Sequence, residues 1–148
     1  MGAIIKRRDF PAVIKQARQG VFVLAPNVTV PIAAPVLNIG LLLGERMYKA
    51  KADSSSVSIV NELDAILGEE YRDITLENTD ILFSPEYGLD VIKLLLQLGR
   101  NQRFYLKWPG VIAGEKLTYS EPGKFDYREY NIKDYVDTYI VLKKKKKL

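Results

Sequence analysis

Residues 21–25, VFVLA, decide the fold class of this chain. Four large apolar residues follow one another here without the polar alternation of a half-buried strand. Such a run is typical of a strand that is covered on both faces, as strands of parallel sheets are. Strand-like and helix-like patterns alternate along the rest of the chain. We therefore expect a three-layer α/β domain with a mainly parallel sheet.

The elements around this strand follow from apolar spacing and from Pro and Gly positions. Helices are expected at residues 10–19, 39–50, 59–67 and 89–98, with residues 53–56 capping the third and Gly20 ending the first. Further strands are expected at 36–38, 73–78, 103–108, 116–123 and 137–142. Residues 26–35, PNVTVPIAAP, contain three prolines and predict a loop. We expect one domain over residues 1–142 and a basic tail over 143–148.

Composition removes several classes of chemistry. The 148 residues are 47% hydrophobic and include neither Cys nor His. Thiol nucleophiles, imidazole bases and the common zinc ligands are therefore absent. No apolar run reaches the roughly 20 residues of a membrane helix, and the first residues do not resemble a signal peptide. We expect a cytoplasmic protein with no membrane partner.

The positive charge is concentrated at the end of the sequence. The net charge is +4, and the tail alone supplies five lysines, Lys143, Lys144, Lys145, Lys146 and Lys147. The rest of the chain is therefore slightly acidic. Clustered lysines bind phosphate backbones, so DNA is one expected partner of the tail. The alternative is a solvated, disordered end, because five like charges repel one another and no aromatic side chain lies between them.

Residues 73–83, DITLENTDILF, combine an apolar strand with two carboxylates, Glu77 and Asp80, at its end. Ligands of open parallel sheets bind beyond the carboxyl ends of the strands. The loop after Ala25, together with Asn38 and Lys107, is predicted to lie at the same edge. Carboxylates placed there are candidate Mg²⁺ ligands. The alternative is that Glu77 and Asp80 only cap or solvate a turn.

The phosphate-binding loop that should accompany a magnesium site is missing. The motif G-x-x-x-x-G-K-[ST] supplies backbone N–H groups, a lysine and a hydroxyl to the phosphates. Residues 25–35 contain no glycine, and no lysine occurs from Gln16 through Tyr48. Prolines in this loop lack N–H donors and stiffen the backbone. Residues 26–35 therefore cannot form the usual phosphate cradle.

Three separated motifs resemble the small P-loop protein of type 3 BREX bacteriophage-defence systems. They are VLNIGLLLGERM at 36–47, ITLENTDILFSPEYGLDVIKLLLQLGRNQRFYLKWPG at 74–110 and LTYSEPGKFDYREY at 117–130. They occur in the order of that family, which implies a P-loop NTPase fold. The departure lies at the front of the chain, where ten residues stand in place of the P-loop and its helix.

The resemblance implies roles for particular residues. Glu77 stands where the family has its magnesium-site Asp, and Asp80 where it has a Glu, so both acids are exchanged. Asn38 lies on the second strand, which contains an Asn in the family. Arg100 and Asn101 match an Arg-Asn pair that precedes the fourth strand. These positions are the candidate binding residues, with Glu77 and Asp80 as magnesium ligands if the site is active.

The expected function is that of a degenerate, non-catalytic P-loop-NTPase-like subunit of a phage-defence complex, acting in binding or assembly. Its partners would be other defence proteins, and no cofactor is expected. One alternative is a divergent Mg-ATP-dependent ATPase in which Arg100, or an Arg of a partner protein, supplies positive charge. Another is a nucleic-acid-binding accessory protein that uses the basic tail. Candidate binding surfaces are this tail and the aromatic and basic residues Tyr119, Phe125, Tyr127, Arg128, Tyr130, Tyr135 and Tyr139.

Overall fold

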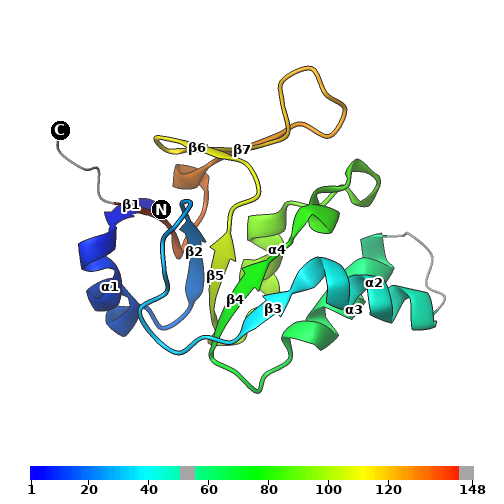
Figure 1. Cartoon of the computed structure of the whole chain (residues 1–148), viewed down its shortest axis with the longest axis horizontal. Coiled ribbons are helices and arrows are strands. Elements are labelled where there is room, and N and C mark those ends of the chain that lie inside the picture. The colour runs from blue at the N-terminus through cyan, green and yellow to red at the C-terminus, as the bar shows by residue number, and fades with distance from the viewer. Residues whose placement is uncertain (51–55, 144–148) are drawn as a thin grey trace.

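The centre of the protein is a sheet of six parallel strands. In the computed structural model, which describes residues 1–50 and 56–143, the strand order is β1-β9-β2-β5-β4-β3 (Figure 1). Its strands are β1 Ala3–Lys6, β2 Gly20–Leu24, β3 Val36–Asn38, β4 Asp73–Glu77, β5 Arg103–Lys107 and β9 Thr138–Leu142. Every neighbouring pair in this sheet is parallel. The prediction of an α/β fold with a mainly parallel sheet is confirmed.

Helices flank both faces of the sheet. They are α1 Phe10–Gln16, α2 Ile39–Ala50, α3 Ser56–Leu67 and α4 Val91–Leu98, with short 3-10 turns η1 Arg7–Asp9, η2 Asp80–Phe83, η3 Pro85–Tyr87 and η4 Ile132–Asp134. The apolar sides of α2, α3 and α4 contribute to the larger core cluster, whereas α1 contributes to a smaller one. The predicted helix cap at residues 53–55 lies outside the described residues.

Strand β2 explains why two cores form. Val21 and Val23 belong to the larger cluster, and Phe22 and Leu24 belong to the smaller one. All four side chains are buried, because successive side chains of a strand point to opposite faces and both faces are covered. The apolar run that predicted a doubly covered strand therefore occupies an interior position, between β9 and β5.

The connection from β2 to β3 contains no helix. Residues 25–35 cross the α1 side of the sheet as an extended loop (Figure 1). Val28 is buried there and joins the smaller core. The carbonyl of Pro35 accepts a hydrogen bond from the Thr75 N–H at 2.8 Å, and the Thr75 hydroxyl donates to the Ala34 carbonyl at 3.3 Å. The predicted loop is confirmed, and it covers a face on which a parallel crossover usually places a helix.

A second, antiparallel sheet was not predicted. Its strands are β6 Val111–Ala113, β7 Lys116–Tyr119 and β8 Arg128–Asn131, in sequence order. This sheet lies between β5 and β9 in the chain. Leu117 and Tyr130 are buried in the larger core cluster together with residues of the parallel sheet. The two sheets thus share one core.

Two element boundaries differ from the prediction for physical reasons. The first helix ends at Gln16, so Gly20 does not end it and instead begins β2. Gly20 has φ 147°, and a Cβ atom there would lie 2.4 Å from the Asp137 carbonyl oxygen. Glycine is required by this close approach. The last long helix begins after Asp90, whose carboxylate accepts from the Lys93 N–H at 3.1 Å, rather than at Leu89.

Candidate functional site

A row of polar side chains crosses the carboxyl edge of the sheet. Asn38 of β3 is paired in register with Glu77 of β4. Lys107 ends β5 in register with Leu24 of β2, one residue after the last pair of β4 and β5. Parallel strands in register present these side chains on one face. The structure therefore brings Asn38, Glu77 and Lys107 together at the edge where ligands of such sheets bind.

Lys107 neutralises the carboxylate that the resemblance assigns to magnesium. Its Nζ lies 3.3 Å from Glu77 Oε2. Both side chains are partly exposed, so the pair stabilises the fold by no more than about 1 kcal/mol. Its importance is chemical, because it places a cation of the protein itself beside Glu77. The sequence alone suggested that Lys107 reaches this edge but not that it pairs with Glu77.

Asn38 serves the local structure. Its Oδ1 accepts from the Leu41 N–H at 3.0 Å, so the side chain caps the first turn of α2. The same oxygen accepts from Asn78 Nδ2 at 2.8 Å. Gly40 permits this arrangement, because a Cβ atom there would lie 2.6 Å from Asn78 Nδ2. These contacts explain an Asn on the second strand without a ligand.

Asp80 is directed toward the second sheet. Burial, followed by the neighbouring charge of Asp80, raises the pKa of the Tyr119 phenol. Tyr119 in turn stacks on Phe83, with ring centroids 4.5 Å apart. Among residues 1–50 and 56–143, no three acidic side chains gather in an arrangement that could hold a metal ion. Asp80 therefore lies near Tyr119, whereas Glu77 pairs with Lys107.

A cavity of about 390 Å³ adjoins the same row. It is lined by Leu24, Ala25, Pro26, Asn27, Val28, Thr29, Lys107 and Trp108. The N–H of Ala25 donates to the Val141 carbonyl, and that of Val28 donates to the Ala25 carbonyl. Pro26 has no N–H group. In this loop, the N–H groups of Ala25 and Val28 are therefore bonded to the protein itself, and the prolines have no N–H to contribute to a nest of successive N–H groups.

The Arg-Asn pair lies at the opposite edge of the sheet. Arg100 and Asn101 precede β5, whereas Glu77 ends the parallel neighbour β4. Arg100 Nη1 lies 2.7 Å from Glu69 Oε1 in an exposed ion pair. A strand of five residues spans about 17 Å. Arg100 and Glu77 therefore lie at opposite edges of the sheet.

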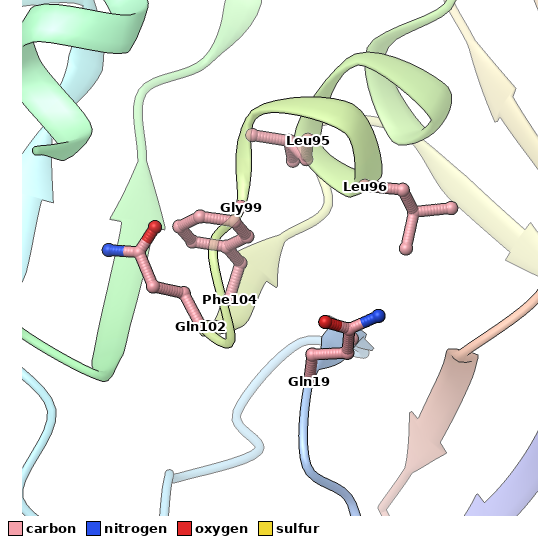
Figure 2. Close-up of a pocket in the computed structure, with 7 residues that line it drawn as sticks. Gln19, Leu95, Leu96, Gly99, Gln102 and Phe104 are labelled. Atoms are coloured by element: carbon pink, nitrogen blue, oxygen red, sulfur yellow. The ribbon is translucent and has the colours of Figure 1, made fainter. Parts of the chain in front are cut away.

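The cavity beneath α4 at the amino edge is small. Figure 2 shows Leu95 and Leu96 of α4 above Phe104, and Gln19 and Gln102 complete the lining. Its volume of about 10 Å³ is enough for one water molecule. Gln102 is buried and donates to the carbonyls of Gly68 and Tyr71. It is a structural residue that fastens the loop after α3.

The strongest polar network was missed by the sequence analysis. Arg103 forms a two-pronged ion pair with Asp73, with Nε to Oδ1 at 2.6 Å and Nη2 to Oδ2 at 2.9 Å. Tyr105 Oη donates to the same carboxylate at 2.7 Å. Arg103 Nη1 also donates to the carbonyls of Ile14 and Ala17, at the end of α1. The network joins two strands to a helix end, and all its donors point at protein atoms.

The aromatic residues proposed as a surface divide into two groups. Tyr130 is buried against Trp108 and Phe83, and Tyr135 donates to Asp90 at 2.7 Å. These rings stabilise the junction of the two sheets. Phe125 is the contrasting case, since 89% of its surface is exposed. Of the lysine tail, Lys143 is exposed at the end of β9, and Lys144, Lys145, Lys146 and Lys147 lie outside the described residues.

Comparisons with protein-family models, with curated proteins and with solved structures found no match to this chain. Within the part of the chain that the structure describes, no helix has the length and apolarity needed to cross a membrane.

Proposed function

We propose that this chain is a non-catalytic relative of P-loop NTPases that acts in binding or assembly within a BREX-like phage-defence complex. The family assignment rests on the three motifs of the sequence. The observation that carries the non-catalytic part is the Lys107–Glu77 pair beside a β2 loop without glycine or helix. No cofactor is needed for this role.

The physical argument concerns the triphosphate. Phosphoryl transfer depends on positioned cations and N–H groups around the phosphates, with a helix N-terminus usually among them. The loop at residues 25–35 offers three prolines without N–H groups, a buried Val28, and N–H groups of Ala25 and Val28 that are already bonded. Lys107, which lines the cavity beside this loop, is paired with Glu77, so its charge is not free for a polyanion. Nucleotide hydrolysis is therefore not supported.

A binding role is supported by the loop between β7 and β8. This segment projects from the body of the molecule (Figure 1). Its shape is held by a 2.6 Å hydrogen bond from Ser120 Oγ to Asp126 Oδ1 and by a turn in which the Lys124 N–H donates to the Glu121 carbonyl. Phe125 is presented to solvent within it. Aromatic residues are enriched among the anchors of protein interfaces.

The purified chain is expected to hydrolyse ATP only at the background rate, and Glu77→Gln is expected to leave that rate unchanged. The reason is that there is no turnover for the carboxylate to support. Phosphate release and thermal unfolding should be measured with and without Mg-ATP. A nucleotide that binds would raise the melting temperature, because ligand at 100 times its dissociation constant stabilises the native state by about 2.7 kcal/mol. We expect no binding and therefore an unchanged melting temperature. An activity that disappears in Glu77→Gln would establish the alternative, a divergent Mg-dependent ATPase.

The assembly role predicts that a tagged chain co-purifies with proteins encoded beside it. Phe125→Ser should weaken this association, because it removes the exposed ring from the projecting loop. Tyr48→Ser on α2 is the matched control, since Tyr48 is 86% exposed and lies away from the second sheet. Retention can be measured by affinity capture followed by size-exclusion chromatography. Absence of any partner would refute the assembly role, and loss with Tyr48→Ser alone would refute the surface.

A further inference from the structure

Cations from the two ends of the chain meet at one place on the carboxyl edge. Strands β1 and β9 are parallel neighbours, with Lys6 in register with Leu142. The chain therefore continues from both strands on the same side, into Arg7 in one case and Lys143 in the other. Neighbouring strands lie about 4.8 Å apart. The sequence alone does not reveal this arrangement, because Arg7 and Lys143 lie far apart along the chain.

These cations surround a cavity of about 670 Å³, which is distinct from the Glu77 site. The lining residues are Lys6, Arg7, Arg8, Ala25, Pro26, Leu142 and Lys143. Ala25 and Pro26 come from the loop that replaces the P-loop helix, and together with Leu142 they supply apolar surface. The volume is within the range of sites for small molecules and nucleotide units. All four charged residues in the lining are basic.

Three of the four positive charges have no counterion among the described residues. Lys6, Arg7 and Lys143 have no acidic group within 4 Å there, and Arg8 has Asp9 at 3.9 Å, in a pair that is mostly exposed. Cations that line one cavity with so little neutralisation repel one another. A bound polyanion would relieve this repulsion.

We propose that this basic cavity, formed by Lys6, Arg7, Arg8 and Lys143, binds the phosphate backbone of a nucleic-acid strand. Arg side chains match phosphate oxygens with paired donors, and lysines add point charges. The apolar surface of Ala25 and Pro26 can accept a sugar or a base face. The inference does not depend on the proposed defence role.

The geometry favours a nucleic acid over a membrane surface. A peripheral membrane site needs apolar side chains that protrude between the cations and enter the lipid. Here the apolar lining consists of the small residues Ala25 and Pro26 and of the half-buried Leu142, and all four charged side chains are exposed. A nucleic-acid strand can place its phosphates against these exposed cations.

The test is binding of a labelled 20-nucleotide single strand, and of the corresponding duplex, by fluorescence anisotropy at several salt concentrations. Arg7→Glu/Arg8→Glu should weaken single-strand binding roughly tenfold or more and reduce the salt slope by about 1.4, since each phosphate contact contributes about 0.7. Lys49→Glu/Lys93→Glu, with the same charge change on α2 and α4, should bind nearly as wild type does. Because Arg7 and Arg8 are exposed, both variants should keep the wild-type melting temperature.

A chain that ends at Lys143 separates the cavity from the tail. It should bind more weakly than the full chain, and Arg7→Glu/Arg8→Glu should still reduce its binding. The proposal is overturned if the two double variants lose affinity equally, or if Arg7→Glu/Arg8→Glu binds as wild type in both chain lengths. It is also overturned if vesicles rich in phosphatidylserine bind the full chain more tightly than either nucleic acid at the same salt.

Discussion

Arg103→Met is expected to lower the free energy of unfolding by about 3 kcal/mol, as for other mostly buried ion pairs that lose one partner. The change leaves Asp73, whose side chain is only 15% exposed, without its counterion. It also removes the donors to the carbonyls of Ile14 and Ala17, so the end of α1 loses its cap. Met retains much of the apolar stem of Arg103, so the measured loss reports the removal of the guanidinium group and not of the stem.

The matched control is Arg100→Met, three residues earlier. Arg100 also forms an ion pair, with Glu69, but both side chains of this pair are largely exposed. Such a pair contributes at most about 1 kcal/mol. Urea unfolding followed by circular dichroism gives both free energies. Equal losses in the two variants would show that the Arg103 network has no special role.

The same network predicts a dependence of stability on pH. Burial acts to raise the pKa of Asp73, but hydrogen bonds from Arg103 and Tyr105 and the charge of Arg103 outweigh it, so the pKa is lowered in the native state. A lowered native pKa contributes stability above the unfolded value of about 3.9, and that contribution is lost as the pH falls through the native value. Asp73→Asn should therefore show a shallower loss of stability below about pH 4 than wild type.

Leu95→Ala is expected to cost about 2–5 kcal/mol, the range for removing a buried leucine from a packed core. Leu95 is fully buried in the larger cluster, on the side of α4 that faces Phe104 (Figure 2). The small size of the neighbouring cavity indicates that little rearrangement can fill the space left by the side chain. Helix propensity is not the cause, since Ala is the better helix former.

Leu41→Ala on α2 is the control for this substitution. Leu41 is 55% exposed, and the same exchange there should change the free energy of unfolding by about 0.5 kcal/mol or less. Chemical denaturation midpoints compare the two variants directly. A midpoint of Leu95→Ala that coincides with that of Leu41→Ala would mean that α4 is not packed as described.

The strands of the interior were predictable because they depend on local composition. The run at 21–25 can bury its apolar side chains only where both faces of the strand are covered, and β2 has both of its faces covered. The stripe at Ile59, Leu63 and Leu67 likewise requires a helix that buries one side. The loop at 26–35 follows from its prolines. For these segments, the pattern of residues leaves one structural solution.

Other elements have no such local signature. Strand β1 has four residues, and its place in the sheet comes from pairing with β9 at the far end of the described chain. In the second sheet, β7 was expected from composition at 116–123 but ends at Tyr119, whereas β6 and β8 are strands of three or four residues that were not expected and that depend on pairing with β7. Arg103 and Asp73 read as ordinary charged residues until the register of β4 and β5 places them side by side.

The candidate sites divide in the same way. The sequence by itself determined that no P-loop is present and that Glu77, Asn38 and Lys107 follow strands, because these are matters of residue type and order. Only the tertiary structure decided that Lys107 pairs with Glu77, that Arg100 lies at the opposite edge, and that the cations of the two chain ends share one cavity. The physical reason is that charge interactions depend on distance in space, and parallel strand pairing sets that distance independently of separation along the chain.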